Sequence, residues 1–155
     1  LGGSLAINGY RHVYLHNCGL GADYGQAELP AVDYSVAQDF GTVALSDDTT
    51  LDEDAWMADR VVEITSIDNM ALPRLDFFKL DVEGYEVPAL TGALATIKKH
   101  RPWIWVEYFI TGTEPIKEAL KDLDNYSFFI VDYQNMLCAP REKLAQITTS
   151  GLQEV

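Results

Sequence analysis

The fold is decided by residues 77–109, which read FFKLDVEGYEVPALTGALATIKKHRPWIWVEYF. The opening run, FFKLDV, is compact and apolar with an acid near its end, which is typical of a buried parallel strand. Residues 86–99 then repeat apolar side chains along one stripe of an amphipathic helix. WIWVEYF, at residues 103–109, is the next β-prone run. Strand, helix and strand in this order predict a βαβ unit, and therefore an α/β fold.

The ends of that helix are marked by charge and by proline. Pro88 is tolerated in the first helical turn because its missing N–H has no partner there. Lys98, Lys99 and His100 complement the negative C-terminal end of the helix dipole, and Pro102 stops the helix. The sequence therefore predicts one continuous helix between the two strands.

On the N-terminal side, two further runs have strand character. HVYLHNC, at residues 12–18, lies between Asn8-Gly9 and Gly19, and RVVEITSI spans residues 60–67. Residues 68–73 are too few for a stable helix of their own, so we expect them to join two strands.

On the C-terminal side, residues 114–123 predict a short helix and YSFFIVDY, at residues 126–133, predicts a strand. Gln134-Asn135 offers a turn, after which MLCA can return antiparallel. The last fifteen residues are expected to be a loose edge helix or tail. The predicted architecture is a mostly parallel sheet with a C-terminal antiparallel hairpin at its edge.

Length and charge limit the classes of function. A chain of 155 residues with 48% apolar residues predicts one domain with its own core. The formal net charge of −13 argues against nucleic acid as a partner. Ten acids and no Lys or Arg fall between His12 and Asp59, so we interpret residues 22–56 as a long solvated surface excursion. No apolar run approaches the length of a membrane helix, so no membrane association is expected.

Cysteine and histidine usage points to no reactive or metal centre. Cys18 and Cys138 lack the spacing of a disulfide scaffold or a CxxC motif, which favours a reducing compartment, the cytoplasm. His12 and His16 share a strand face, but two histidines without a third ligand make a weak metal case. We therefore expect no metal site from these residues.

Three carboxylates at predicted strand ends are the candidate catalytic residues. Asp81 ends FFKLDV, Glu83 follows in the turn, and Glu107 lies near the end of the next strand. Ligands in open α/β sheets collect at the carboxyl ends of strands, so Asp81 and Glu107 are expected to face one crevice. Structural roles compete: Asp81 can satisfy Lys79 on the same strand face, Glu83 can cap the helix, and Glu107 can simply be solvated.

At this point the segment resembles a known family. LPRLDFFKLDVEGYEVPALTGALATIKKHRPWIWVE, at residues 72–107, resembles the hallmark segment of the FkbM-family methyltransferases, with its DVEGYE turn and RPWIWVE strand in order. TSIDNMALPRLD, SLAINGYRHVYLHNCGLG and QDFGTVAL resemble flanking pieces of the same family. The resemblance covers nearly the whole chain.

The resemblance implies an S-adenosylmethionine-dependent methyltransferase with a Rossmann-like sheet. Its acceptor would be the hydroxyl oxygen of a small molecule or glycan. Asp81, Glu83 and Glu107 would position that acceptor or remove its proton. Asn17, Cys18 and Gly19 would meet the adenine, and Asp81 would face the methionine end of the cofactor.

One departure from the family concerns the start of the chain. A strand with a Gly-rich cofactor turn, and a second strand ending in an acid, are expected before Leu1 and are not in these 155 residues. We therefore expect the N-terminal strands of the fold to be missing, and the isolated chain to bind the cofactor poorly or not at all. An uncovered sheet edge would also favour homo-oligomers.

Two other functions stay open at this stage. The chain can be a catalytically silent α/β module that binds a partner or cation through the acidic stretch. It can also be a metal-dependent phosphate enzyme using Asp81, Glu83 and Glu107, which would require tight magnesium binding that is lost on Asp81→Ala.

Overall fold

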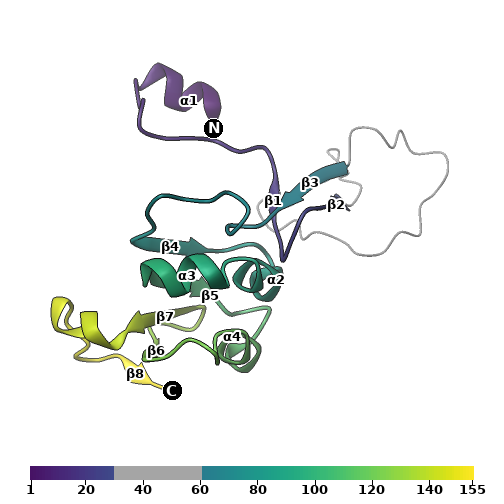
Figure 1. Cartoon of the computed structure of the whole chain (residues 1–155). Coiled ribbons are helices and arrows are strands. Elements are labelled where there is room, and N and C mark those ends of the chain that lie inside the picture. Colours follow the sequence, from purple (N-terminus) through teal and green to yellow (C-terminus); the bar gives the residue numbers. More distant parts are fainter. Residues whose placement is uncertain (30–60) are drawn as a thin grey trace.

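The computed structural model describes residues 1–29 and 61–155. Its elements form a mixed α/β fold, drawn in Figure 1. In chain order they are α1 (Gly2–Ile7), β1 (Gly19–Leu20), β2 (Gly25–Glu28), β3 (Val61–Thr65), β4 (Phe77–Leu80), α2 (Glu86–Thr91), α3 (Leu94–His100), β5 (Trp103–Glu107), α4 (Thr113–Ala119), β6 (Tyr126–Ile130), β7 (Asn135–Pro140), a 3₁₀ helix (Arg141–Gln146) and β8 (Gln153–Glu154).

The predicted βαβ unit is confirmed. β4 and β5 pair in parallel, with Leu80 opposite Val106, and α2 and α3 connect them and lie over them in Figure 1. Leu90 and Ile97 from the helices are fully buried in one core with Leu80 and Ile104. This burial of apolar side chains between helix and sheet is the main stabilising term of the fold.

β4 is half-buried and not the fully buried strand that its composition predicted. Phe78 and Leu80 face the core, whereas Phe77 and Lys79 are exposed on the opposite face. The reason is that β4 is the edge strand of its sheet and α2 and α3 pack on one face of it. The exposed Lys79 side chain can consequently reach along the chain to Asp81.

The single helix predicted before Pro102 is in fact two, because the chain is interrupted at Gly92. A Cβ on Gly92 would lie 2.1 Å from the carbonyl oxygen of Gly21, so only glycine allows this close approach. The Asp68 N–H donates to the Gly92 carbonyl at 2.9 Å, and the Asp68 carboxylate accepts hydrogen bonds from the N–H groups of Ala95 and Thr96 at 3.1 and 2.7 Å. α3 is therefore capped from a distant loop.

The N-terminal strands form a separate small sheet in the order β1-β3-β2. The strand predicted at residues 12–18 is wrong: within residues 1–29 and 61–155 these residues pair with no strand, and all but Cys18 are exposed. Pairing begins at Gly19, opposite Ile64 of β3. β2 pairs antiparallel with β3, so part of the predicted excursion is a strand. Residues 30–56 of the excursion, with QDFGTVAL, lie outside the described residues.

The C-terminal sheet has the order β4-β5-β7-β6-β8 and is mixed. In the described residues β1–β3 and β4–β5 are the parallel pairs and the other four pairs are antiparallel, so a mostly parallel sheet is not what forms. The predicted hairpin is confirmed as β6–β7, but β7 lies inside the sheet between β5 and β6, and all of its residues except Asn135 are buried there. The expected tail includes β8, which pairs with β6 as the new edge.

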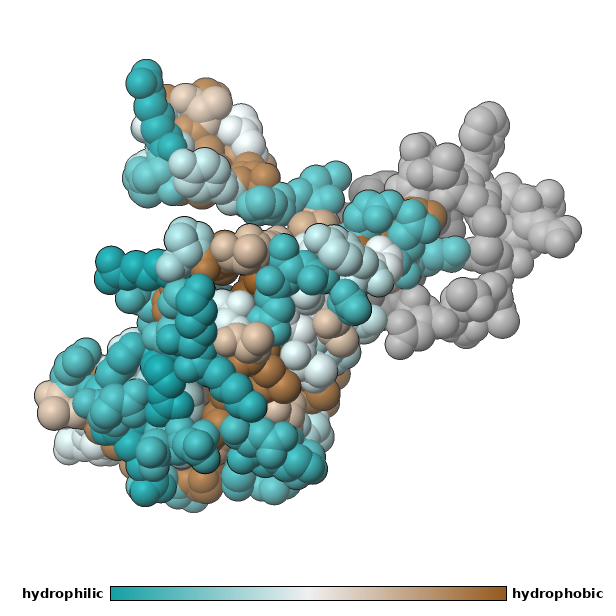
Figure 2. All heavy atoms as spheres, in the orientation of Figure 1, coloured by the Kyte–Doolittle hydropathy of each residue, from teal (hydrophilic) through white to brown (hydrophobic). Residues whose placement is uncertain are grey.

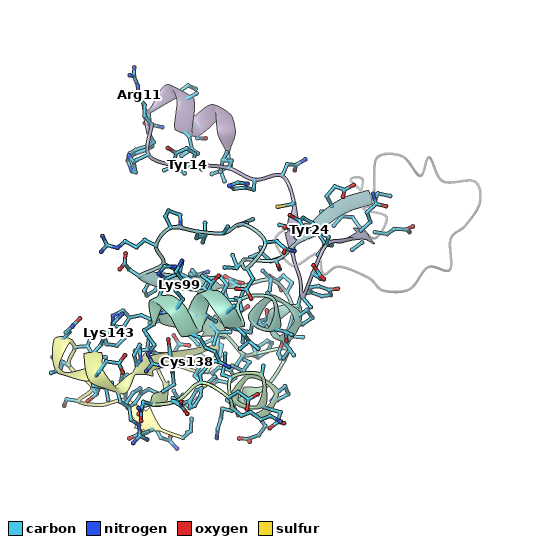
Figure 3. The ribbon with its side chains drawn as sticks, in the orientation of Figure 1. Arg11, Tyr14, Tyr24, Lys99, Cys138 and Lys143 are labelled. Atoms are coloured by element: carbon cyan, nitrogen blue, oxygen red, sulfur yellow. The ribbon has the colours of Figure 1, made fainter. Side chains whose placement is uncertain are left out.

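The N-terminal segment stands apart from both sheets (Figure 1). Its hydrophobic side chains show on the surface in Figure 2, and Figure 3 shows Arg11 and Tyr14 on this segment, away from the sheets. The exposed large apolar residues of the segment are Leu1, Ile7, Tyr10, Val13, Tyr14 and Leu15. Among the described helices, none has the length and apolar character needed to cross a membrane.

Candidate functional site

The three predicted carboxylates converge at the carboxyl ends of β4 and β5. Asp81 directly follows β4, Glu107 is the last residue of β5, and the parallel register places these strand ends side by side. One oxygen from each of Asp81, Glu83 and Glu107 lies within 4.8 Å of the others. We call these residues the acidic cluster. The meeting of Asp81 and Glu107 was predicted from their strand-end positions, and in the structure Glu83 joins them.

Electrostatics divide the acidic cluster into unlike members. The Lys79 ammonium donates to Asp81 Oδ2 at 2.5 Å, and this hydrogen bond lowers the pKa of the Asp81 carboxyl. Partial burial, followed by the negative charge of Asp81, raises the pKa of Glu107 above its usual value. Of these two carboxyls, Glu107 therefore holds a proton more readily, and Asp81 is the more readily ionised.

Asp81 does form the ion pair with Lys79 that its competing structural role predicted. The pair lies at the surface, with side chains 57% and 38% exposed. A surface pair of this kind stabilises a fold by less than about 1 kcal/mol. The contact is therefore compatible with a functional Asp81, whose charge it maintains.

Glu83 is held in an unusual backbone conformation. Its φ is 51°, and the following Gly84 has a φ of 93°, so two consecutive residues occupy the left-handed region. For glutamate this conformation costs on the order of 1 kcal/mol, and it persists only where surrounding contacts impose it. The turn after β4 is therefore a strained feature at the edge of the sheet where the carboxylates meet.

A cavity of about 280 Å³ lies beside the acidic cluster and reaches the small N-terminal sheet. It joins Cys18 and Gly19, two of the residues predicted for the adenine end, to Asp81, predicted for the methionine end. Asn17 is exposed and is not part of the lining. The lining residues are Cys18, Gly19, Leu20, Leu29, Val62, Asp81, Val82, Glu83 and Tyr85.

The cavity lining combines two kinds of side chain. Leu20, Leu29 and Val62 are apolar, whereas Asp81 and Glu83 are acidic. Apolar walls with a few convergent polar groups are the usual composition of a small-molecule site. The volume is close to the lower end of the range for such sites, about 300 to 1,000 Å³.

Comparison with known proteins assigns the family. The family described as Methyltransferase FkbM domain matches residues 5–133, which include the cavity lining and the acidic cluster. The chain belongs to the FkbM methyltransferase domain family. A search of curated proteins finds no match.

The fold of this FkbM domain is also found in a solved structure. The crystal structure of methyltransferase FkbM from Methylobacillus flagellatus KT aligns with a TM-score of 0.58 and 17% sequence identity. The alignment covers 88% of this chain and 32% of the other, so the chain spans about a third of that protein's length. At this identity the likeness establishes the fold.

Several cavity residues of the FkbM domain were not predicted from the sequence. Leu29 and Val62 come from different parts of the small sheet, and no local pattern singles them out as site residues. Tyr85 stands in the DVEGYE turn, where the run of acids and aromatic residues was a usable signal. Within the described residues, one group of potential metal-ligating side chains has its ligand atoms close enough together to hold an ion. This group is Asp81, Glu83 and Glu107.

Proposed function

We propose that this FkbM domain is the methyltransferase domain of an S-adenosylmethionine-dependent enzyme that acts on a hydroxyl oxygen. The observation that carries the proposal is the cavity that runs from Cys18 and Gly19 to the acidic cluster. The cofactor supplies a methyl group on a positively charged sulfur. The protein's task is then to align an acceptor oxygen with that methyl and to receive the acceptor's proton.

The residues of the cavity fit such a cofactor. The apolar wall of Leu20, Leu29 and Val62 suits an aromatic base, and the ionised Asp81 suits a positive sulfonium. The carboxylates disfavour an anionic ligand in the same place. The chain lacks a GxGxxG motif, so we expect the affinity of these 155 residues for the cofactor to be weak.

Glu107 is the best candidate for the proton acceptor. Its raised pKa makes it a stronger base than an ordinary glutamate, and it adjoins Asp81 at the neighbouring strand end. Asp81 and Glu83 then serve to position the acceptor hydroxyl as hydrogen-bond acceptors. Three carboxylates in one place favour a neutral acceptor with several hydroxyls, a small molecule or a glycan.

The rim next to Glu107 has features that suit such an acceptor. The Tyr108 hydroxyl donates to the Asp132 carbonyl at 2.9 Å, which ties the β6–β7 turn to the end of β5. Phe109, two residues after Glu107, is 64% exposed, and Tyr133, in the β6–β7 turn, is 74% exposed. Exposed aromatic residues so close in the chain to these strand ends suit a sugar-like ligand, whose faces are apolar and whose edges carry hydroxyls.

A competition experiment on Cys18 tests cofactor binding. Cys18 lines the cavity, whereas Cys138 is fully buried (Figure 3) and its burial raises the pKa of its thiol. We expect iodoacetamide to modify Cys18 first and millimolar S-adenosylhomocysteine to slow that modification. Cys138 is the internal control. Equal rates with and without ligand would count against the proposal.

The metal-dependent phosphate alternative is separated by cation binding. The close approach of the three carboxylate oxygens is the observation in its favour. It requires tight magnesium binding to the wild type that is lost in Asp81→Asn. The methyltransferase proposal requires instead that methyl transfer to a hydroxylated acceptor persists in the presence of a chelator and falls in Glu107→Gln.

A further inference from the structure

Glu86 is a buried carboxylate whose partners are N–H and O–H groups. Its side chain belongs to the first residue of α2 and is 2% exposed. Glu86 Oε1 accepts hydrogen bonds from the N–H groups of Val82 and Gly84, at 3.2 and 3.1 Å. Glu86 Oε2 accepts a hydrogen bond from the hydroxyl of Thr111. A buried carboxylate is expensive unless it is hydrogen-bonded, and these contacts provide that compensation.

The two backbone contacts enclose Glu83. Val82 and Gly84 are its chain neighbours on either side, and both donate to the same Glu86 oxygen. They hold the turn in which Glu83 and Gly84 adopt left-handed backbone conformations. Glu86 therefore imposes the conformation in which the Glu83 carboxylate lies close to those of Asp81 and Glu107.

The third contact joins the turn to the next loop. Thr111 lies in the segment between β5 and α4, and β5 ends in Glu107. The two segments also approach closely, because a Cβ on Gly84 would lie 3.2 Å from a methyl carbon of Ile110. One carboxylate thus connects the segment carrying Asp81 and Glu83 to the segment that follows Glu107.

We propose that Glu86 is a positioning residue of the site, which holds the Glu83 turn and the loop of Thr111 in the arrangement that brings the acidic cluster together. As a role in catalysis this inference rests on the proposed function. As a role in site geometry it rests on the contacts alone. Glu86 itself is buried and does not line the cavity.

Amide hydrogen exchange of the 155-residue chain tests the geometric role. We expect Glu86→Gln, which replaces one acceptor oxygen by an amide, to speed exchange at the Val82 and Gly84 N–H groups by about tenfold. Thr111→Val keeps the shape of the side chain and removes the hydroxyl that donates to Oε2. This variant leaves the Glu86 charge intact. If the Thr111 contact holds the acidic cluster together, its loss should lower the raised pKa of Glu107, and carboxyl ¹³C NMR measures that pKa.

The matched control is Glu114→Gln, which makes the same chemical change on an exposed glutamate of α4. It should leave both readouts unchanged. The Glu107 titration is read in Thr111→Val and not in Glu86→Gln, because Glu86→Gln also removes a negative charge that itself raises the pKa of Glu107. Unchanged exchange in Glu86→Gln, or equal loss of protection throughout β6 and β7, would overturn the proposal. Neither readout uses the cofactor, so a failure of the proposed function would be seen separately.

Discussion

Asp81 and Glu107 lie at adjacent strand ends, and the pKa values of their carboxyls are shifted in opposite directions. Lys79 lowers the pKa of Asp81, and the resulting fixed negative charge adds to the effect of burial in raising that of Glu107. A carboxyl with a lowered pKa beside a carboxyl with a raised pKa can serve as one positioning group and one proton acceptor.

Asp81→Asn should lower the pKa of Glu107 toward its ordinary value. The substitution removes the repelling charge and releases the Lys79 ammonium, and both changes favour the ionised form of Glu107. Carboxyl ¹³C NMR titration measures the shift directly, with the exposed Asp122→Asn as control. In any transfer assay, activity that rises with pH through the pKa of Glu107 should rise at lower pH in Asp81→Asn. An unchanged or higher pKa of Glu107 would contradict this coupling.

Gly92→Ala should destabilise the fold by about 3 kcal/mol. The new Cβ would lie 2.1 Å from the Gly21 carbonyl oxygen and 2.7 Å from the Ser66 Cβ, so backbone must move. Gly25→Ala is the control, since a Cβ there meets nothing within 4 Å. Urea unfolding compares the two variants, and equal free energies of unfolding would show that the contact at Gly92 is unimportant.

Asp68→Ala should destabilise the chain by about 1 kcal/mol through loss of the α3 cap. Its carboxylate accepts hydrogen bonds from two N–H groups at the start of α3, and alanine leaves both unpaired. The exposed Asp122→Ala should stay within about 0.5 kcal/mol of wild type. Thermal unfolding followed by circular dichroism measures both. The idea fails if the two variants melt together.

The Arg101–Glu142 pair should make stability depend on pH. The Arg101 guanidinium donates to both Glu142 oxygens at 2.9 Å and lowers the pKa of Glu142 to about 2, from 4.5. The unfolded chain therefore binds this proton first as the pH falls. The pair's contribution is complete above pH 4.5 and is lost as the pH falls toward 2.

Glu142→Gln should accordingly cost about 0.5 to 1 kcal/mol at pH 7 and nothing near the acid limit, because the pair is partly exposed. Urea unfolding at a series of pH values gives the difference from wild type. Glu154→Gln is the control, since Glu154 lies 3.8 Å from Arg141 and should contribute little. A difference that stays constant with pH would show that the charge of Glu142 does not stabilise the fold.

The part of the site that the sequence predicted depends on local patterns. A compact apolar run predicted β4, a stripe with helical period predicted a helical connection, and a β-prone run predicted β5; parallel pairing of the two strands then brings Asp81 and Glu107 together. Cys18 and Gly19 were predicted by position in the fold, and they line the same cavity as Asp81. Their roles in binding and catalysis stay predictions.

What the sequence did not predict was decided by distant partners. The break at Gly92 exists because Gly21 and Asp68 approach from other loops, and no feature of the helix sequence encodes them. Residues 12–18 have strand-forming side chains but pair with no strand in the part of the chain that the structure describes. The position of β7 inside the sheet depends on how the whole core packs. The role of Glu86 could be inferred only from its hydrogen bonds in the folded chain.

The most direct test of the cavity as a cofactor site is a ¹H–¹⁵N NMR titration of the chain with S-adenosylhomocysteine. The account predicts weak, saturable binding in the millimolar range, with shifts concentrated at the amides of Cys18, Gly19, Val62 and Asp81. Asp81→Asn should weaken the response to S-adenosylmethionine more than to S-adenosylhomocysteine, since only the former carries a positive sulfur. Shifts confined to other surfaces, or no shifts up to the solubility limit of the ligand, would contradict the assignment of the cavity as a cofactor site.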